Sequence, residues 1–345
     1  MNALPASTFP SSFASTATPV NLPAPMLFDR EEIEAAQRTV YAAMPPTPQY
    51  AWPLLSARLG ATVWAKHENH TPVGAFKIRG GLTYFEMLAR RQPAVRHVVS
   101  ATRGNHGQSV GFAARRHGLA ATIVVPHGNS VEKNAAMRAL GVTLIEHGDD
   151  FQEASEHAGL LAVRDGLHRV PSFHRDLVRG VATAYVEFFD ALRESPPDVL
   201  FVPIGLGSGF AAAAAARAYC GVSTRLIGVV SSHATAYRDS FKAGRPMEAP
   251  VSTRLADGMA CRTPVPEALD VIRHEADDVI AVSDDEVAEA MRALFVDTHN
   301  VAEGAGAAAL AAALQQQDRW RDKTVGIALT GGNVDTGMFA GVLAG

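Results

Sequence analysis

The chain has 345 residues, a formal net charge of −4 and 47% hydrophobic residues. That length and apolar content suffice for one large domain or two of ordinary size. No basic excess or Lys/Arg-rich patch points to nucleic acid or an anionic membrane surface, so the expected ligand is a small molecule.

The first 25 residues are rich in Ser, Thr, Ala and Pro and carry no charged side chain. They lack the basic start and the continuous apolar stretch of a signal peptide. No apolar run in the chain is long enough to span a membrane. We therefore predict a disordered tail over residues 1–25, with a dimer contact as the alternative, and a cytoplasmic protein.

The segment Thr-Pro-Val-Gly-Ala-Phe-Lys-Ile-Arg-Gly, residues 71–80, places Lys77 directly after Phe76 and a turn of small residues. Apolar neighbours would strip water from the ammonium group and lower the pKa of the lysine. Lys77 is then a candidate imine-forming amine. A solvated surface lysine is the alternative that this motif alone leaves open.

The segment Ser-Ala-Thr-Arg-Gly-Asn-His-Gly-Gln-Ser, residues 100–109, ends a predicted strand over residues 97–100 and opens a predicted helix over residues 105–117. Backbone N–H groups at a helix N-terminus suit an anion such as a carboxylate. Asn105 adds a side-chain donor that could reach a phenolate oxygen. A simple polar helix cap is the alternative.

Short apolar runs alternate with helical patterns along the rest of the chain, which predicts parallel sheets and an α/β fold. The predicted strands are residues 122–125, 142–145, 199–203, 226–230 and 325–329. Helices are predicted over residues 131–140 and 211–219. Ser283 and Glu286 match a capping box, which predicts that a further helix begins there. The polar segment 171–176 could be a crossing between domains.

Gly205-Leu206-Gly207-Ser208-Gly209 follows the apolar strand over residues 199–203 and precedes an Ala-rich helix. Glycines allow several backbone N–H groups to turn towards one phosphate. The loop has neither the Lys-Ser/Thr of a P-loop nor the full dinucleotide fingerprint. A phosphate loop of another kind is therefore the functional interpretation.

Two later segments carry single polar side chains among small apolar residues. Glu303 precedes a small-residue helix, where burial would raise its pKa, although a helix-terminal charge is the alternative. Thr330 ends the last predicted strand and could present its hydroxyl to a ring nitrogen, or simply form a turn.

Singly these motifs are weak, but their order and spacing resemble those of one family. From about residue 35 onwards the chain resembles the fold-type II enzymes that depend on pyridoxal 5′-phosphate (PLP), and among them the serine/threonine dehydratase (ammonia-lyase) group. The resemblance rests on Phe76-Lys77-x-Arg79-Gly80, the Gly-Asn-His-x-Gln run from Gly104, and the later glycine loop and Thr-Gly-Gly-Asn end.

This resemblance implies a fold like that of the tryptophan synthase β-subunit, with two domains that each hold a mainly parallel, twisted sheet flanked by helices. Residues 26–96 and 171–345 would form the large PLP-binding domain. Residues 97–170 would form the small domain with the substrate loop. The family also implies a homodimer.

The family further implies roles for individual residues. Lys77 would carry PLP as a Schiff base and move the Cα proton, Phe76 would pack near the ring, Asn105 would bond the 3′-oxygen, and Glu303 would face the active site. Thr330 would face the pyridine nitrogen, and Gly205, Leu206, Gly207 and Ser208 would bind the phosphate. The substrate would be held by Thr102, Arg103, Gly104 and His106.

Two departures narrow the prediction. Arg103 stands where these enzymes usually have Ser or Ala; in serine racemases that serine is the second proton carrier, and a guanidinium is too basic to replace it. Residues 229–236 lack the carboxylates of the racemase-like metal site, so we predict no divalent metal there.

We therefore predict a PLP-dependent carbon–nitrogen lyase that eliminates water and ammonia from a β-hydroxy-α-L-amino acid. A neutral hydroxyl at Thr330 would leave the ring a weak electron sink, which favours elimination over transamination or racemisation. The preferred substrate is L-phenylserine- or L-threonine-like, with L-serine and 3-hydroxyaspartate as alternatives. A β-replacement synthase, a racemase and a non-catalytic PLP-binding or ligand-binding protein are the competing hypotheses.

Overall fold

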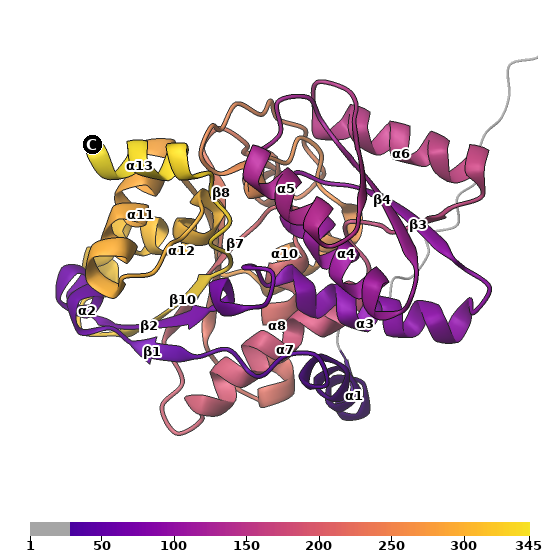
Figure 1. Cartoon of the computed structure of the whole chain (residues 1–345). Helices are drawn as coiled ribbons and strands as arrows, with labels where there is room; N and C mark the ends of the chain where they lie inside the picture. Colours follow the sequence, from indigo (N-terminus) through magenta and orange to yellow (C-terminus); the bar gives the residue numbers. More distant parts are fainter. Residues whose placement is uncertain (1–27) are drawn as a thin grey trace, which may run out of the picture.

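The structure, a computed structural model, describes residues 28–345. They fold into two β-sheets with helices packed against their faces (Figure 1). The tail predicted over residues 1–25 lies outside the described residues. None of the described helices is both long and apolar enough to cross a membrane.

The larger sheet has six strands in the order β1-β2-β10-β7-β8-β9. Its strands are β1 Gln49–Ala51, β2 Thr62–His67, β7 Val199–Pro203, β8 Arg225–Ser231, β9 Asp278–Val282 and β10 Thr324–Leu329. β1 is antiparallel to β2, and the other neighbouring strands are parallel. Every residue of β7 is buried, as expected of an apolar run in a parallel sheet that is covered on both faces.

Helices cover both faces of this sheet. They are α1 Arg30–Tyr41, α2 Pro53–Leu59, α7 Arg175–Ala191, α8 Ser208–Cys220, α9 Ala236–Ala243, α10 Pro266–Glu275, α11 Asp284–Thr298, α12 Gly304–Gln315 and α13 Thr336–Ala344. Because side chains alternate along a strand, Phe201 packs in the cluster with α2, α11, α12 and α13, whereas Leu200 packs with α1, α7, α8, α9 and α10. The capping box predicted at Ser283 and Glu286 is present at the start of α11.

The smaller sheet has four parallel strands in the order β5-β4-β3-β6. They are β3 His97–Ala101, β4 Ala120–Val125, β5 Thr143–Glu146 and β6 His168–Arg169. Apolar residues of α3 Lys77–Arg91, α4 Asn105–Arg116 and α5 Val131–Ala139 form one cluster on this sheet, and α6 Phe151–Asp165 contributes to another. These strands fall inside the predicted small domain, and the domain boundaries themselves stay a prediction.

The predicted α/β class with two mainly parallel sheets is confirmed, and each predicted strand is present within one or two residues at its ends. Helix α8 begins at Ser208, earlier than the predicted start at residue 211. It can do so because Gly207 caps it with a φ of 93°, a conformation that glycine adopts without strain. Three short 3-10 turns complete the described chain: η1 Glu68–His70, η2 Asp257–Met259 and η3 Gln317–Arg319.

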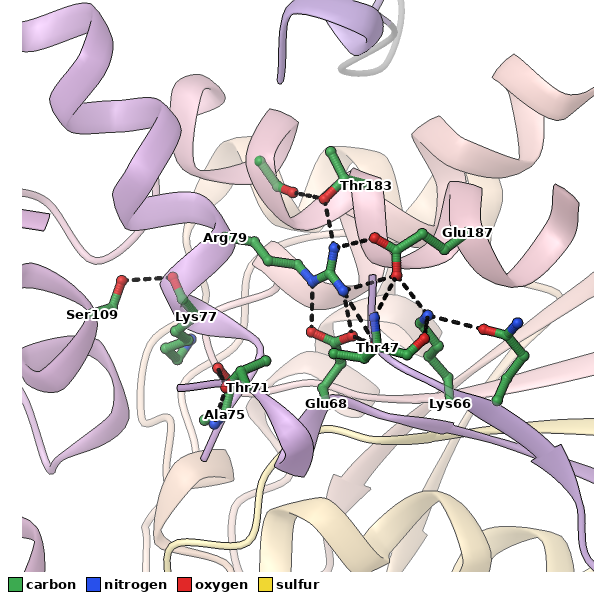
Figure 2. Close-up of polar contacts among 12 residues, drawn as sticks. Thr47, Lys66, Glu68, Thr71, Ala75, Lys77, Arg79, Ser109, Thr183 and Glu187 are labelled. Atoms are coloured by element: carbon green, nitrogen blue, oxygen red, sulfur yellow. Dashed lines mark hydrogen bonds and ion pairs between the residues drawn. The ribbon is translucent and has the colours of Figure 1, made fainter. Parts of the chain in front are cut away.

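A buried network of charges joins α3 to the larger sheet (Figure 2). Arg79 is fully buried, and its guanidinium donates two hydrogen bonds to the Glu68 carboxylate, at 2.7 and 2.9 Å, and two to Glu187, at 2.6 and 2.9 Å. Lys66 Nζ donates to Glu187 at 2.6 Å. Burial would raise the pKa of Glu68, but Arg79 and Lys66 outweigh it and hold that pKa below its usual value. The two cations and two carboxylates therefore neutralise one another.

Replacing Arg79 by methionine should lower the free energy of unfolding by about 3–5 kcal/mol, because Glu68 and Glu187 would remain as two buried carboxylates with only the Lys66 ammonium to balance them. Urea unfolding monitored by circular dichroism measures this loss. The matched control is Arg321→Met, which breaks the exposed Arg321–Asp318 ion pair and should change the same quantity by less than about 0.5 kcal/mol. Equal effects of the two variants would contradict a structural role for the network.

Candidate active site

Lys77 is the first residue of α3, and the segment before it is attached to the end of β10. Thr71 Oγ1 accepts a hydrogen bond from Ala75 N–H and donates one to Ala75 O, each at 2.9 Å (Figure 2). Phe76 N–H donates to Thr330 O at 3.0 Å. Ser109 on α4 donates its hydroxyl to Lys77 O at 2.6 Å. The backbone of Lys77 is therefore held by elements of both sheets.

The turn before Lys77 requires glycine. Gly74 has a φ of 67°, and a Cβ there would lie 2.5 Å from Asn333 Oδ1. Asn333 Nδ2 donates to Val73 O at 2.8 Å, so the same side chain that excludes a larger residue also fixes the turn.

The Lys77 side chain is partly buried, and its amine lies beside the ring of its sequence neighbour Phe76. Its Nζ lies 4.7 Å from the centroid of the Phe76 ring. Burial lowers the pKa of Lys77 to about 8, although the Glu303 carboxylate opposes the shift. About a tenth of the amine is therefore neutral and nucleophilic at pH 7, far more than for an ordinary lysine.

The loop before α4 presents unused N–H donors. Gly104 adopts a φ of 151°, and Thr102 Oγ1 accepts from the N–H groups of Gly104 and Gly107, at 2.9 and 3.3 Å. Within the described part of the chain, no acceptor contacts the N–H of Arg103, Asn105 or His106. Free N–H groups at the positive end of a helix suit a carboxylate.

His106 is neutral in this loop. Burial, with a smaller effect of Lys77, lowers the pKa of His106 to about 3. Its Nε2 atom is buried, and no hydrogen-bond partner contacts it among residues 28–345. The imidazole can therefore donate or accept one hydrogen bond to a ligand without adding charge to the site.

A second buried network joins α5 to the other side of the site. Asn105 Nδ2 donates to Glu303 Oε1 at 2.5 Å, and Lys133 Nζ lies 3.0 Å from Glu303 Oε2 and 2.8 Å from Asp257 Oδ2. Burial raises the pKa of Glu303, against the opposing effect of Lys133. The paired carboxylates in turn raise the pKa of Lys133 in spite of its burial, so Lys133 is charged and its charge is compensated.

The glycine loop after β7 forms a cradle of backbone donors. No hydrogen bond in the described structure uses the N–H of Gly205, Leu206, Gly207 or Ser208. A Cβ on Gly205 would lie 2.2 Å from Gly258 O, and one on Gly207 would lie 2.5 Å from the Ala268 Cβ. The absence of side chains lets these segments approach one another and leaves several donors for one anion.

Two adjoining cavities contain the residues predicted from the sequence. The smaller spans about 400 Å³, part of it open to solvent, and is lined by Phe76, Lys77, Asn105, the 205–208 loop, Glu303 and Thr330. The larger spans about 610 Å³, also partly open to solvent, and is lined by Thr102, Arg103, Gly104 and His106, and again by Lys77 and Asn105. The structure therefore brings all the predicted site residues together.

Sequence reasoning missed other residues that line the larger cavity, among them Lys133, Phe151, Asp257 and Cys261. Their local sequence carries no signal of function: Lys133, for instance, is an ordinary first-turn lysine of an amphipathic helix. Only packing reveals it, because a Cβ on Gly104 would lie 2.4 Å from Lys133 Cδ.

Comparison with known protein families matches residues 40–331 to the family described as pyridoxal-phosphate dependent enzyme. The chain belongs to this family. It is 32% identical over 310 residues to the L-threonine ammonia-lyase of Thermotoga maritima, which covers 90% of this chain and 76% of that protein. It is likewise 32% identical over 302 residues to the L-threo-3-hydroxyaspartate ammonia-lyase of a Pseudomonas species, with 87% and 93% covered.

Among solved structures, the processed form of threonine deaminase isoform 2 from Solanum lycopersicum matches with a TM-score of 0.81 at 27% identity, covering 93% of this chain and 96% of that one. The predicted family, fold type and cofactor are confirmed: this is a PLP-dependent enzyme of fold type II whose relatives are ammonia-lyases.

The described residues fit PLP. The free N–H groups of residues 205–208 suit its phosphate, and a buried lysine of lowered pKa lies in the same small cavity. Thr330 Oγ1 makes only a long contact, 3.4 Å, to Ala305 O. Its hydroxyl therefore remains free to bond a ring nitrogen.

The capture of PLP by the apoenzyme should accelerate as the pH rises towards about 8 and then level off, because only the neutral Lys77 amine attacks and its pKa is about 8. A lysine with the ordinary pKa of about 10.4 would continue to accelerate far above that pH. Stopped-flow absorbance of the lysine-bound cofactor measures the rate. Glu303→Gln should shift the midpoint to lower pH, because the Glu303 carboxylate raises the pKa of Lys77.

Proposed function

We propose that this protein is an ammonia-lyase that converts a β-hydroxy-α-L-amino acid to a 2-oxo acid and ammonia by eliminating water across Cα and Cβ. The observation that carries the proposal is the position of the Lys77 amine. It lies where two cavities meet, one with the free donors of residues 205–208 and the other with those of the α4 loop. Cofactor and substrate anions can thus be bound on either side of the same amine.

We assign the residues as follows. PLP, when bound, supplies an electron sink for the bond that breaks at Cα. The N–H groups of residues 205–208 would hold its phosphate, Asn105 would donate to its phenolate oxygen, and Phe76 would pack on the ring. The N–H groups of Arg103, Asn105 and His106 would orient the substrate carboxylate. Lys77, once released, would take the Cα proton and could return it to the departing hydroxyl.

Thr330 supports elimination over competing reactions. Its hydroxyl is neutral, and the carboxylate in the same cavity, Glu303, is already bound by Asn105 and Lys133. Without a carboxylate to protonate the ring nitrogen, charge is poorly stabilised at Cα, and expulsion of the β-hydroxyl as the proton leaves avoids that charge.

A racemase is disfavoured by the lining of the cavity. Racemisation needs a second proton carrier opposite Lys77. Arg103 is a permanent cation, and His106 is a weak base because burial has lowered its pKa to about 3. A β-replacement synthase, the other alternative, would consume sulfide with O-acetylserine.

The substrate side chain is the finer part of the proposal. The sequence favoured L-phenylserine or L-threonine, with L-serine and 3-hydroxyaspartate as alternatives. Phe151 is the one aromatic residue in the described lining of the larger cavity, where Arg103, His106, Lys133, Ser172 and Asp257 contribute polar groups. This lining gives little support to a phenyl ring. A homodimer in the cytoplasm remains a prediction from the family resemblance.

Purified enzyme with PLP should release a 2-oxo acid and ammonia from at least one member of a panel of L-threonine, L-serine, L-phenylserine and the 3-hydroxyaspartates. Lys77→Ala should reduce this rate by about 10³-fold or more, because the base at Cα is removed. It should also lose the visible absorption band of the lysine-bound cofactor. Lys242→Ala, on an exposed surface of α9, is the matched control and should keep both.

Failure of the whole panel would defeat the ammonia-lyase proposal even if PLP is bound. Product formation only with sulfide and O-acetylserine would point to the synthase, and chiral inversion of recovered substrate to the racemase.

A further inference from the structure

Arg103 is a cation of the larger cavity with no partner in the described structure. It lies between Thr102 and Gly104 in the loop before α4 and lines the cavity. No ion pair or hydrogen bond among residues 28–345 reaches its guanidinium, and its Nε atom is buried. A guanidinium that is partly removed from water without a partner loses hydration that nothing replaces.

The other charged side chains around the cavity already have partners or an assigned role. Lys133 is paired with Glu303 at 3.0 Å and with Asp257 at 2.8 Å. Lys77 is the amine assigned to the cofactor, and His106 is neutral. Arg103 is therefore the cation of the larger cavity whose guanidinium no carboxylate of residues 28–345 contacts.

The α-carboxylate of an amino acid does not need this side chain. The free N–H groups of Arg103, Asn105 and His106, at the positive end of α4, can bind it. The Arg103 side chain also lines the cavity and ends in a planar fork that matches a carboxylate. The cavity thus offers two separate points for two anionic groups.

We propose that the Arg103 guanidinium binds a second carboxylate, attached to Cβ, so that the preferred substrate is the acidic β-hydroxy amino acid 3-hydroxyaspartate. This inference rests on the proposed ammonia-lyase function and names the side chain it acts on. The water lost at Cβ is regained when the product imine is hydrolysed, so 3-hydroxyaspartate yields oxaloacetate and ammonia. L-threonine and L-phenylserine, which lack the second carboxylate, leave Arg103 without a partner.

The test compares kcat/KM for 3-hydroxyaspartate and for L-threonine in the wild-type holoenzyme, in Arg103→Gln and in Arg103→Lys. Arg103→Gln should lower the ratio of the two values by about 10- to 150-fold, the range expected for loss of hydrogen bonds between charged groups. Arg103→Lys, which keeps the charge but not the planar fork, should lose less. Arg262→Gln, which breaks the exposed Arg262–Asp150 ion pair outside the cavity lining, is the matched control and should leave the ratio unchanged.

A binding measurement tests the same contact without turnover. Succinate and butyrate have the same carbon chain but differ by one carboxylate. Calorimetric titration of the holoenzyme should show tighter binding of succinate, and Arg103→Gln should remove that preference. The absorption spectrum of each variant establishes that the cofactor site is intact.

The outcomes separate the two proposals. If Arg103→Gln lowers kcat/KM equally for 3-hydroxyaspartate and L-threonine, Arg103 binds the α-carboxylate and the inference is overturned. If it changes neither value, Arg103 binds no substrate carboxylate, which also overturns the inference. Preference of the wild type for L-phenylserine would overturn it as well. If no substrate is turned over, the ammonia-lyase proposal fails, and the succinate preference alone then decides whether Arg103 recognises a second carboxylate.

Discussion

The Arg79 network is the interaction on which the position of Lys77 depends. Arg79 lies on α3, two residues beyond Lys77. Its fully buried guanidinium lies between the carboxylates of Glu68 and Glu187. The Lys77 amine itself has no hydrogen-bond partner in the described structure, so its place is set by its backbone. Because α3 packs on both α7 and α4, anchoring its first turn also sets the distance of the amine from both sheets. The buried charges are paired with one another, which favours the observed placement of the helix.

The site forms where strands of the two sheets end. β3 leads into the Arg103 loop, β7 into the glycine loop, and β10 into Thr330. The carboxyl ends of parallel strands lie on one edge of a sheet, and ligands bind there in open α/β folds. Glycines at these ends leave backbone N–H groups without acceptors, which suits the phosphate and carboxylate groups of the proposed ligands. Lys133 and its two carboxylate partners then link the smaller sheet to the larger across the site.

Much of this site could be predicted because its motifs are local. A strand, a glycine turn and a helix start follow one another within a few residues, so the donors of residues 103–106 and 205–208 can be recognised without knowing the fold. Lys133 and Asp257 could not be found in this way. Their role comes from contact between α5 and η2, which are far apart in the sequence, and neither segment has an unusual composition. Arg79 was recognised as part of a family motif, but its function as a buried structural ion was not foreseen.

By itself, the sequence determined the alternation of strands and helices, the glycine turns that expose backbone donors, and the lysine that follows an aromatic residue. These features depend on side-chain periodicity and on backbone freedom, which are properties of neighbouring residues. Only the tertiary structure decided which charges are neutralised. Lys66, Arg79 and Lys133 all meet carboxylates contributed by distant segments, whereas Arg103 meets none among residues 28–345. Whether a charge is paired depends on which segments pack together, because electrostatic attraction acts through space and not along the chain.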